Sequence, residues 1–118
     1  MNKELKFRAW ITPWGSDSQP HMKYIEDLQL HVYFGNWERG GYKDAVFQQY
    51  IGLKDKNGKE IYKGDIVEIG DRKKEVIFGL GMFYIDENYG DIVPVSEVDN
   101  IIKVIGNIFE NPELIKNK

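Results

Sequence analysis

Residues 49–68 read QYIGLKDKNGKEIYKGDIVE and carry the strongest local structural signals in the chain. At its centre, Asn57-Gly58 separates two short runs of strand-forming residues. Asn and Gly are the residues that best tolerate the positive φ angles of a two-residue type I′ turn. Gly64-Asp65 then allows a tight turn before the β-branched run at 66–69. The stretch therefore predicts a β-hairpin followed at once by another strand.

Outside this stretch, apolar residues recur mostly with a period of two, which is typical of half-buried strands. Pro94 lacks a backbone donor, so its strand is expected at a sheet edge or a bulge. Residues 44–49 fit a short helix and a strand about equally well, and Asn111-Pro112-Glu113 predicts one helical turn. Loops are expected at 12–20 and 35–43, and further strands at 7–11, 28–34, 75–78, 82–85, 92–95 and 101–109. The fold class is therefore predicted to be all-β.

The composition fits one soluble domain spanning residues 1–118. The chain has 118 residues, a net charge of -3, 42% hydrophobic residues and no cysteine. Such a chain has enough apolar residues for one core, and the lack of cysteine excludes disulfides and thiolate ligands. The uncharged run at 76–85 is shorter than the roughly 18 residues that a membrane helix needs. With no apolar signal sequence near Met1, a cytoplasmic location is expected.

No catalytic or metal-binding pattern stands out, so neither an enzyme nor a cofactor is expected. His21 and His31 lack a third ligand at a suitable spacing, and no serine occupies a nucleophile elbow. The tryptophans Trp10, Trp14 and Trp37 are a possible ligand platform, but small β-cores use the same residues. A carboxylate-rich segment does not follow the spacing of a calcium-binding loop. Its acidic residues are Asp86, Glu87, Asp91, Glu97 and Asp99.

Basic residues cluster around the expected hairpins, and this cluster is the basis of a nucleic-acid-binding alternative. Acidic residues alternate with them, and no basic residue lies between Lys74 and Lys103, so a mixed solvated surface is favoured over a phosphate-binding one. The candidate contacts are Lys54, Lys56, Lys59, Lys63, Arg72, Lys73 and Lys74.

The uncharged run at 76–85 also predicts self-association. A strand in so small a domain can bury only one face against its own core, and edge strands leave backbone groups unpaired. A homo-oligomer is therefore expected, with a contact that includes part of the segment formed by Met82, Phe83, Tyr84 and Ile85.

Three blocks together resemble the YopX family of phage and prophage proteins. They are KFRAW at 6–10, the stretch at 49–68 quoted above, and VIGNIFENPEL at 104–114. They occur in the family's order. Apart from the first block, the N-terminal segment 1–45 is variable, and so are residues 70–98. The segment KGDIVE at 63–68 is also similar to the start of the first strand in SH3-like barrels, which favours a small SH3-like barrel over an open twisted antiparallel sheet.

The resemblance implies a small β protein encoded by temperate phages or prophages, and it brings no catalytic motif. The expected function is therefore that of a non-catalytic accessory protein that binds a host or phage protein in the bacterial cytoplasm. Weak nucleic-acid binding through the basic residues between Lys54 and Lys74 is the alternative.

Overall fold

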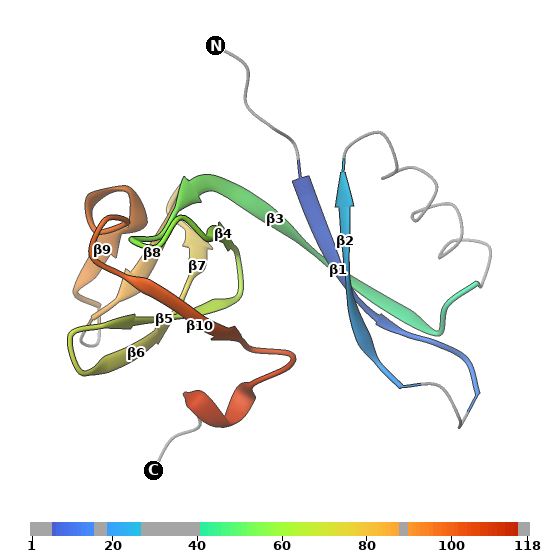
Figure 1. Cartoon of the computed structure of the whole chain (residues 1–118). Helices are drawn as coiled ribbons and strands as arrows, with labels where there is room; N and C mark the ends of the chain where they lie inside the picture. The colour runs from blue at the N-terminus through green and yellow to red at the C-terminus, as the bar shows by residue number, and fades with distance from the viewer. Residues whose placement is uncertain (1–5, 16–18, 27–40, 88–89, 116–118) are drawn as a thin grey trace. The chain divides into compact units, whose positions relative to one another are not determined.

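The computed structural model describes residues 6–15, 19–26, 41–87 and 90–115 (Figure 1). The predicted strand at 28–34, with His31, and the predicted loop residue Trp37 lie outside these ranges. The described residues are strand-dominated, which confirms the all-β prediction. The elements are β1 (Lys6–Thr12), β2 (His21–Glu26), β3 (Asp44–Lys54), β4 (Glu60–Tyr62), β5 (Asp65–Ile69), β6 (Arg72–Glu75), β7 (Ile77–Gly79), β8 (Met82–Asp86), β9 (Ile92–Pro94), the 3-10 turn η1 (Val95–Glu97), β10 (Lys103–Asn107) and the 3-10 turn η2 (Pro112–Leu114).

The chain divides into two compact units, Met1–Tyr50 and Ile51–Lys118. The division falls inside β3, whose first part belongs to the first unit and whose last part belongs to the second. The single domain expected from the length stays a prediction. Two units that share one strand unfold in some proteins as one cooperative unit and in others as two.

The first unit contains an antiparallel sheet in the order β2-β1-β3. Alternation along β1 places Ala9 and Ile11 on one face, where they pack with Ile25 and half-buried Tyr42 and Phe47. Residues 44–49, which fitted helix and strand equally, form a strand because they pair in register with β1. Pairing with a distant segment thus decided what local sequence left open.

The second unit contains two three-stranded antiparallel sheets, β10-β5-β6 and β7-β8-β9. The 3-10 turn η1 precedes β10, which returns to pair with β5 at the start of the unit. The small SH3-like barrel that the segment at 63–68 favours stays a prediction. The predicted strand at 75–78 is split at Val76, which leaves β6 and β7 as consecutive short strands.

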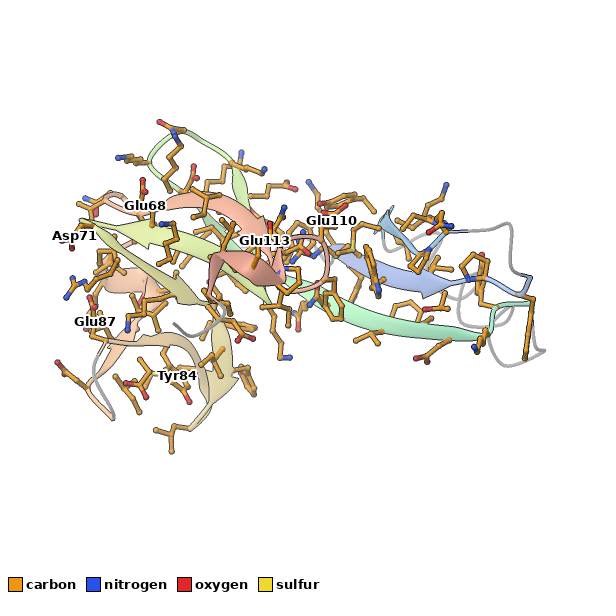
Figure 2. All side chains as sticks on the ribbon, turned by 90° about the horizontal axis from the view of Figure 1, so that it is seen from below. Glu68, Asp71, Tyr84, Glu87, Glu110 and Glu113 are labelled. Carbon is orange, nitrogen blue, oxygen red and sulfur yellow. The ribbon has the colours of Figure 1, made fainter. Side chains whose placement is uncertain are left out.

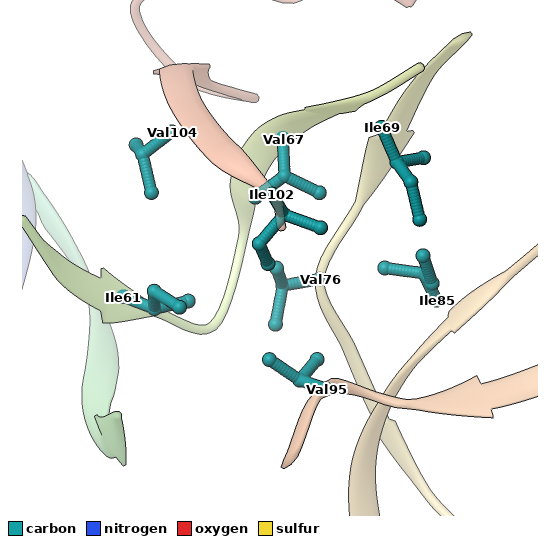
Figure 3. Packing of buried hydrophobic residues seen from close by; sticks show 8 residues of the cluster. All are labelled: Ile61, Val67, Ile69, Val76, Ile85, Val95, Ile102 and Val104. Carbon is teal, nitrogen blue, oxygen red and sulfur yellow. The ribbon is translucent and has the colours of Figure 1, made fainter. Parts of the chain in front are cut away.

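Aliphatic side chains from both sheets form the core of the second unit (Figure 3). All of them are β-branched. Some lie on strands of the two sheets or on β4, and the others lie between strands or in η1. Half-buried Phe83 and Val93 pack against the edge of this cluster. Its buried members are Ile61, Val67, Ile69, Val76, Ile85, Val95, Ile102 and Val104.

The turn at Asn57-Gly58 is present, but the predicted type I′ geometry is wrong. Gly58 has φ +84, whereas Asn57 is not among the described residues with positive φ. The Gly58 amide donates to the Asp55 carbonyl at 2.9 Å, and the Asp55 amide donates to the Lys59 carbonyl at 2.8 Å. This is a three-residue loop with one left-handed glycine. The Asp55 side chain favours it by accepting hydrogen bonds from the backbone of Asn57 and Lys59.

Gly58→Val is expected to destabilise the protein by about 1 kcal/mol or more, because a β-branched residue disfavours φ +84. No neighbouring atom lies within 4 Å of a Cβ added there, so the effect is due to backbone strain alone. Chemical denaturation measures it, with Asn57→Ala as the control at a position without positive φ. An unchanged unfolding midpoint for Gly58→Val would contradict the turn geometry.

Two sequence predictions concern the ends of β9 and β10, and the structure confirms them in part. Pro94 ends β9, an edge strand, as expected. The predicted helical turn near the C-terminus is η2, but Asn111 does not cap it with its side chain. Its Oδ1 instead accepts a hydrogen bond from the Asn107 amide at 3.2 Å, so Asn111 stabilises the bend that follows β10.

Candidate functional site

The β7–β8 hairpin closes with a two-residue turn of unusual composition. Leu80 has φ 53 and Gly81 has φ +76, the sign pattern of a type I′ turn. Leu80 is the only described non-glycine residue with positive φ. The left-handed region costs an ordinary L-residue roughly 1–2 kcal/mol. Leu80 therefore adopts a strained backbone conformation that leucine disfavours.

The same turn exposes apolar side chains to solvent. Leu80 is 79% exposed and Phe78 is 51% exposed. Phe78 lies opposite Phe83 in the strand register, and their ring centroids are 4.9 Å apart. Burial therefore offers little compensation for the strained backbone of Leu80. We call Phe78, Leu80 and Phe83 the hairpin tip.

The body of the hairpin is anchored in the second unit. Ile85 is fully buried in the core, and Phe83 packs against that core. On the other face the Tyr84 ring covers Gly79, since a Cβ built at Gly79 would lie 3.2 Å from Tyr84 Cε1. The base is thus fixed in place, whereas Phe78 and Leu80 of the hairpin tip remain exposed.

This arrangement changes the predicted self-association segment. Ile85 is in the core and offers no surface to another chain, while Met82, Phe83 and Tyr84 are half-buried. The most exposed apolar residues of the hairpin, Phe78 and Leu80, lie just before that segment. The uncharged run at 76–85 was the sequence signal for them. Self-association itself stays a prediction.

Part of the basic cluster lines an open groove of about 320 Å³ in the second unit. Arg72 is committed to an ion pair there, with Nη1 and Nη2 each 3.2 Å from one oxygen of Glu87 (Figure 2). By strand register, Glu68 lies opposite Lys73 and also opposite Lys103. The positive charge of the groove is therefore partly neutralised. The groove is lined by Asp71, Arg72, Lys73, Lys74, Leu114 and Ile115.

The remaining basic candidates do not line that groove. Lys54, Lys56 and Lys59 are exposed at the β3–β4 hairpin. Lys63 lies near Glu75, where burial raises the pKa of the Glu75 carboxyl and the positive charge of Lys63 offsets part of this rise. The structure thus separates the predicted nucleic-acid contacts into a groove set and a hairpin set.

The other sequence candidates are dispersed. Exposed His21 begins β2, and its Nδ1 lies 3.1 Å from the Gln19 carbonyl oxygen. Trp14 is 60% exposed after β1, whereas Trp10 is half-buried within that strand. Within the described ranges, no group of three histidine or carboxylate side chains is placed to hold a metal ion.

Comparison with known proteins identifies the family. The profile of the family described as YopX protein matches residues 6–116, so the chain belongs to the YopX family. The fold is also similar to the crystal structure of protein EF1440 from Enterococcus faecalis. The TM-score is 0.55 and the identity is 27%, over 98% of this chain and 100% of that one. No curated protein matches the sequence. Among the described residues, no helix has the length and apolarity that crossing a membrane would require.

Proposed function

We propose that this YopX-family protein is a phage- or prophage-encoded accessory protein that acts in the host cytoplasm as a non-catalytic interaction module. Its binding surface is the hairpin tip formed by Phe78, Leu80 and Phe83. The observation that carries the proposal is Leu80, which combines φ 53 with an exposed fraction of 79%. Exposed apolar groups and strained backbone both concentrate at functional sites.

The anchoring of the hairpin supports a binding role. A rigid base keeps Phe78 and Leu80 in one arrangement, so a partner has little ordering entropy to overcome when it covers them. Aromatic and aliphatic side chains that enter a partner's pocket are typical of the few residues that dominate binding energy. The family resemblance supports the phage origin.

Affinity capture from host bacteria tests this function. The tagged chain is compared with the double variant Phe78→Ser and Leu80→Asn, and with Val46→Thr as a control. Val46 is also an exposed apolar residue, at 40%, but it lies on β3 in the first unit. We expect the wild type and the control to retain the same stoichiometric partner from the soluble fraction, and the double variant to lose it. Equal recovery by all three would contradict the proposal.

Nucleic-acid binding is the second candidate, because Arg72, Lys73 and Lys74 share one groove. The ion pair between Arg72 and Glu87 and the carboxylate of Glu68 opposite Lys73 lower its attraction for phosphate. We therefore rank it below protein binding.

Gel retardation of labelled duplex and single strands at low salt tests this second function. Binding through phosphate contacts would weaken steeply as the salt concentration rises and would require these three residues. We expect to see no such complex. Tight, salt-sensitive binding that is lost when all three become alanine would reverse the ranking. Asp71→Ala in the same groove is the control for nonspecific damage.

The predicted homo-oligomer is tested separately. Light scattering coupled to gel filtration gives the mass in solution. A single 13.8 kDa species across micromolar concentrations would exclude self-association, whereas a concentration-dependent larger species would support it.

A further inference from the structure

The hairpin tip belongs to a part of the chain that has only negative formal charge. Every charged side chain between Lys74 and Lys103 is a carboxylate. This segment includes the whole β7-β8-β9 sheet and η1. The carboxylates are Glu75, Asp86, Glu87, Asp91, Glu97 and Asp99.

Strand pairing places carboxylates at both ends of this sheet. β9 runs antiparallel to β8, with Pro94 opposite Tyr84, so η1 follows β9 in the direction of the hairpin turn. Exposed Glu97 ends η1, and η1 contacts β8. At the other end, exposed Asp91 precedes β9. Glu87 is neutralised by Arg72, so Asp91 and Glu97 are the carboxylates that we assign to the binding surface.

These charges discriminate among possible occupants of the tip. A nucleic acid or an anionic membrane would be repelled by the exposed carboxylates of Asp91 and Glu97. A second copy in a symmetric contact would bring the same carboxylates together, and like charges across an interface are unfavourable. A basic protein surface gains from both features, since its cations meet the carboxylates while its apolar pocket covers Phe78 and Leu80.

We propose that the hairpin tip binds a protein surface on which lysine and arginine side chains surround an apolar pocket. This inference rests on the proposed function, because it assumes that Phe78 and Leu80 form the binding surface. The apolar contact supplies most of the affinity, and the carboxylates supply rate and selectivity. A basic surface of this kind is typical of proteins that bind nucleic acids.

Selection from a displayed library of random 12-residue peptides against the full chain tests the inference without a known partner. We expect the enriched peptides to contain lysine or arginine beside one or two large apolar residues. A resynthesised peptide should bind the Leu80→Asn variant at least tenfold more weakly, and Val46→Thr should bind it like the wild type. Asp91→Asn combined with Glu97→Gln should weaken binding severalfold at low salt and reduce the salt dependence.

The other outcomes distinguish failure of the basic-partner inference from failure of the proposed binding function. Enriched peptides that are neutral or acidic, but still require Leu80, would overturn the basic-partner inference and leave the hairpin as a binding surface. Basic peptides that bind Leu80→Asn and wild type equally would overturn both. Absence of any enriched peptide would overturn the inference, while affinity capture from host cells would still test the proposed function.

Discussion

Replacing Asp55 by alanine is expected to lower the free energy of unfolding by about 3–4 kcal/mol, the largest stability effect that we predict for one side chain. Asp55 is buried, with 6% exposure, where the β3–β4 hairpin meets β10. Its Oδ1 accepts the amides of Asn57 and Lys59, each at 2.9 Å, and its Oδ2 accepts the Val104 amide at 2.7 Å. Alanine would leave these three donors without their acceptor.

The effect should depend on pH. Burial alone would raise the pKa of Asp55, but the hydrogen bonds from Val104, Lys59 and Asn57 and the charge of Lys59 lower it below its ordinary 3.8. Because the folded-state pKa lies below the unfolded one, the stabilisation by Asp55 is complete above the unfolded pKa. It is lost as pH falls through the folded-state pKa.

Urea denaturation of wild type and Asp55→Ala between pH 7 and pH 2 measures both effects. The difference in stability should be constant above about pH 5 and shrink toward pH 2. Asp91→Ala, which removes an exposed carboxylate, is the control and should change stability by less than about 0.5 kcal/mol. A difference for Asp55→Ala below 1 kcal/mol at pH 7 would contradict the role assigned to this carboxylate.

The second large effect is expected at Leu80, where stability and binding should change in opposite directions. Asn tolerates the left-handed conformation, and Asn-Gly is a preferred type I′ pair, so Leu80→Asn should stabilise the protein by about 0.5–1 kcal/mol. Little burial is lost, since Leu80 is 79% exposed. Removal of a central apolar contact should nevertheless weaken partner binding by about 2 kcal/mol, or roughly 30-fold.

Thermal unfolding and a titration with the captured partner measure these two quantities. Leu80→Ala is a useful comparison because it removes the apolar side chain and keeps most of the backbone strain. We expect it to lose affinity without the gain in stability. If Leu80→Asn were less stable than wild type, the strain at this turn would be refuted. If it bound the partner with wild-type affinity, Leu80 would have no place in the binding surface.

Much of the fold was predictable because alternation and turn chemistry act locally. Alternation of apolar and polar residues indicated β1, and the β-branched run after Gly64-Asp65 indicated β5. The type of turn at Asn57-Gly58 was not predictable, because it depends on how the Asp55 carboxylate is shared between the turn and Val104, 49 residues away in sequence. A long-range contact selected among turns that the local sequence allows.

The candidate site was predictable only in outline. The uncharged run at 76–85 indicated an exposed apolar surface, and the hairpin tip lies inside it. Which side chains are exposed could not be derived, because Phe78 lies directly opposite Phe83, which packs against the core, and is nevertheless 51% exposed. The turn at Leu80-Gly81 was not predicted from the sequence, because leucine disfavours positive φ.

Site-specific photo-crosslinking in living host cells tests the central claim most directly. A photoreactive phenylalanine derivative replaces Leu80 in one variant and Asn57, in the exposed turn of the β3–β4 hairpin, in another. After illumination, we expect a discrete heavier product from position 80 that is absent from position 57. Identical products from both positions, or none from position 80 while the chain is folded and abundant, would contradict the assignment of the hairpin tip as the binding surface.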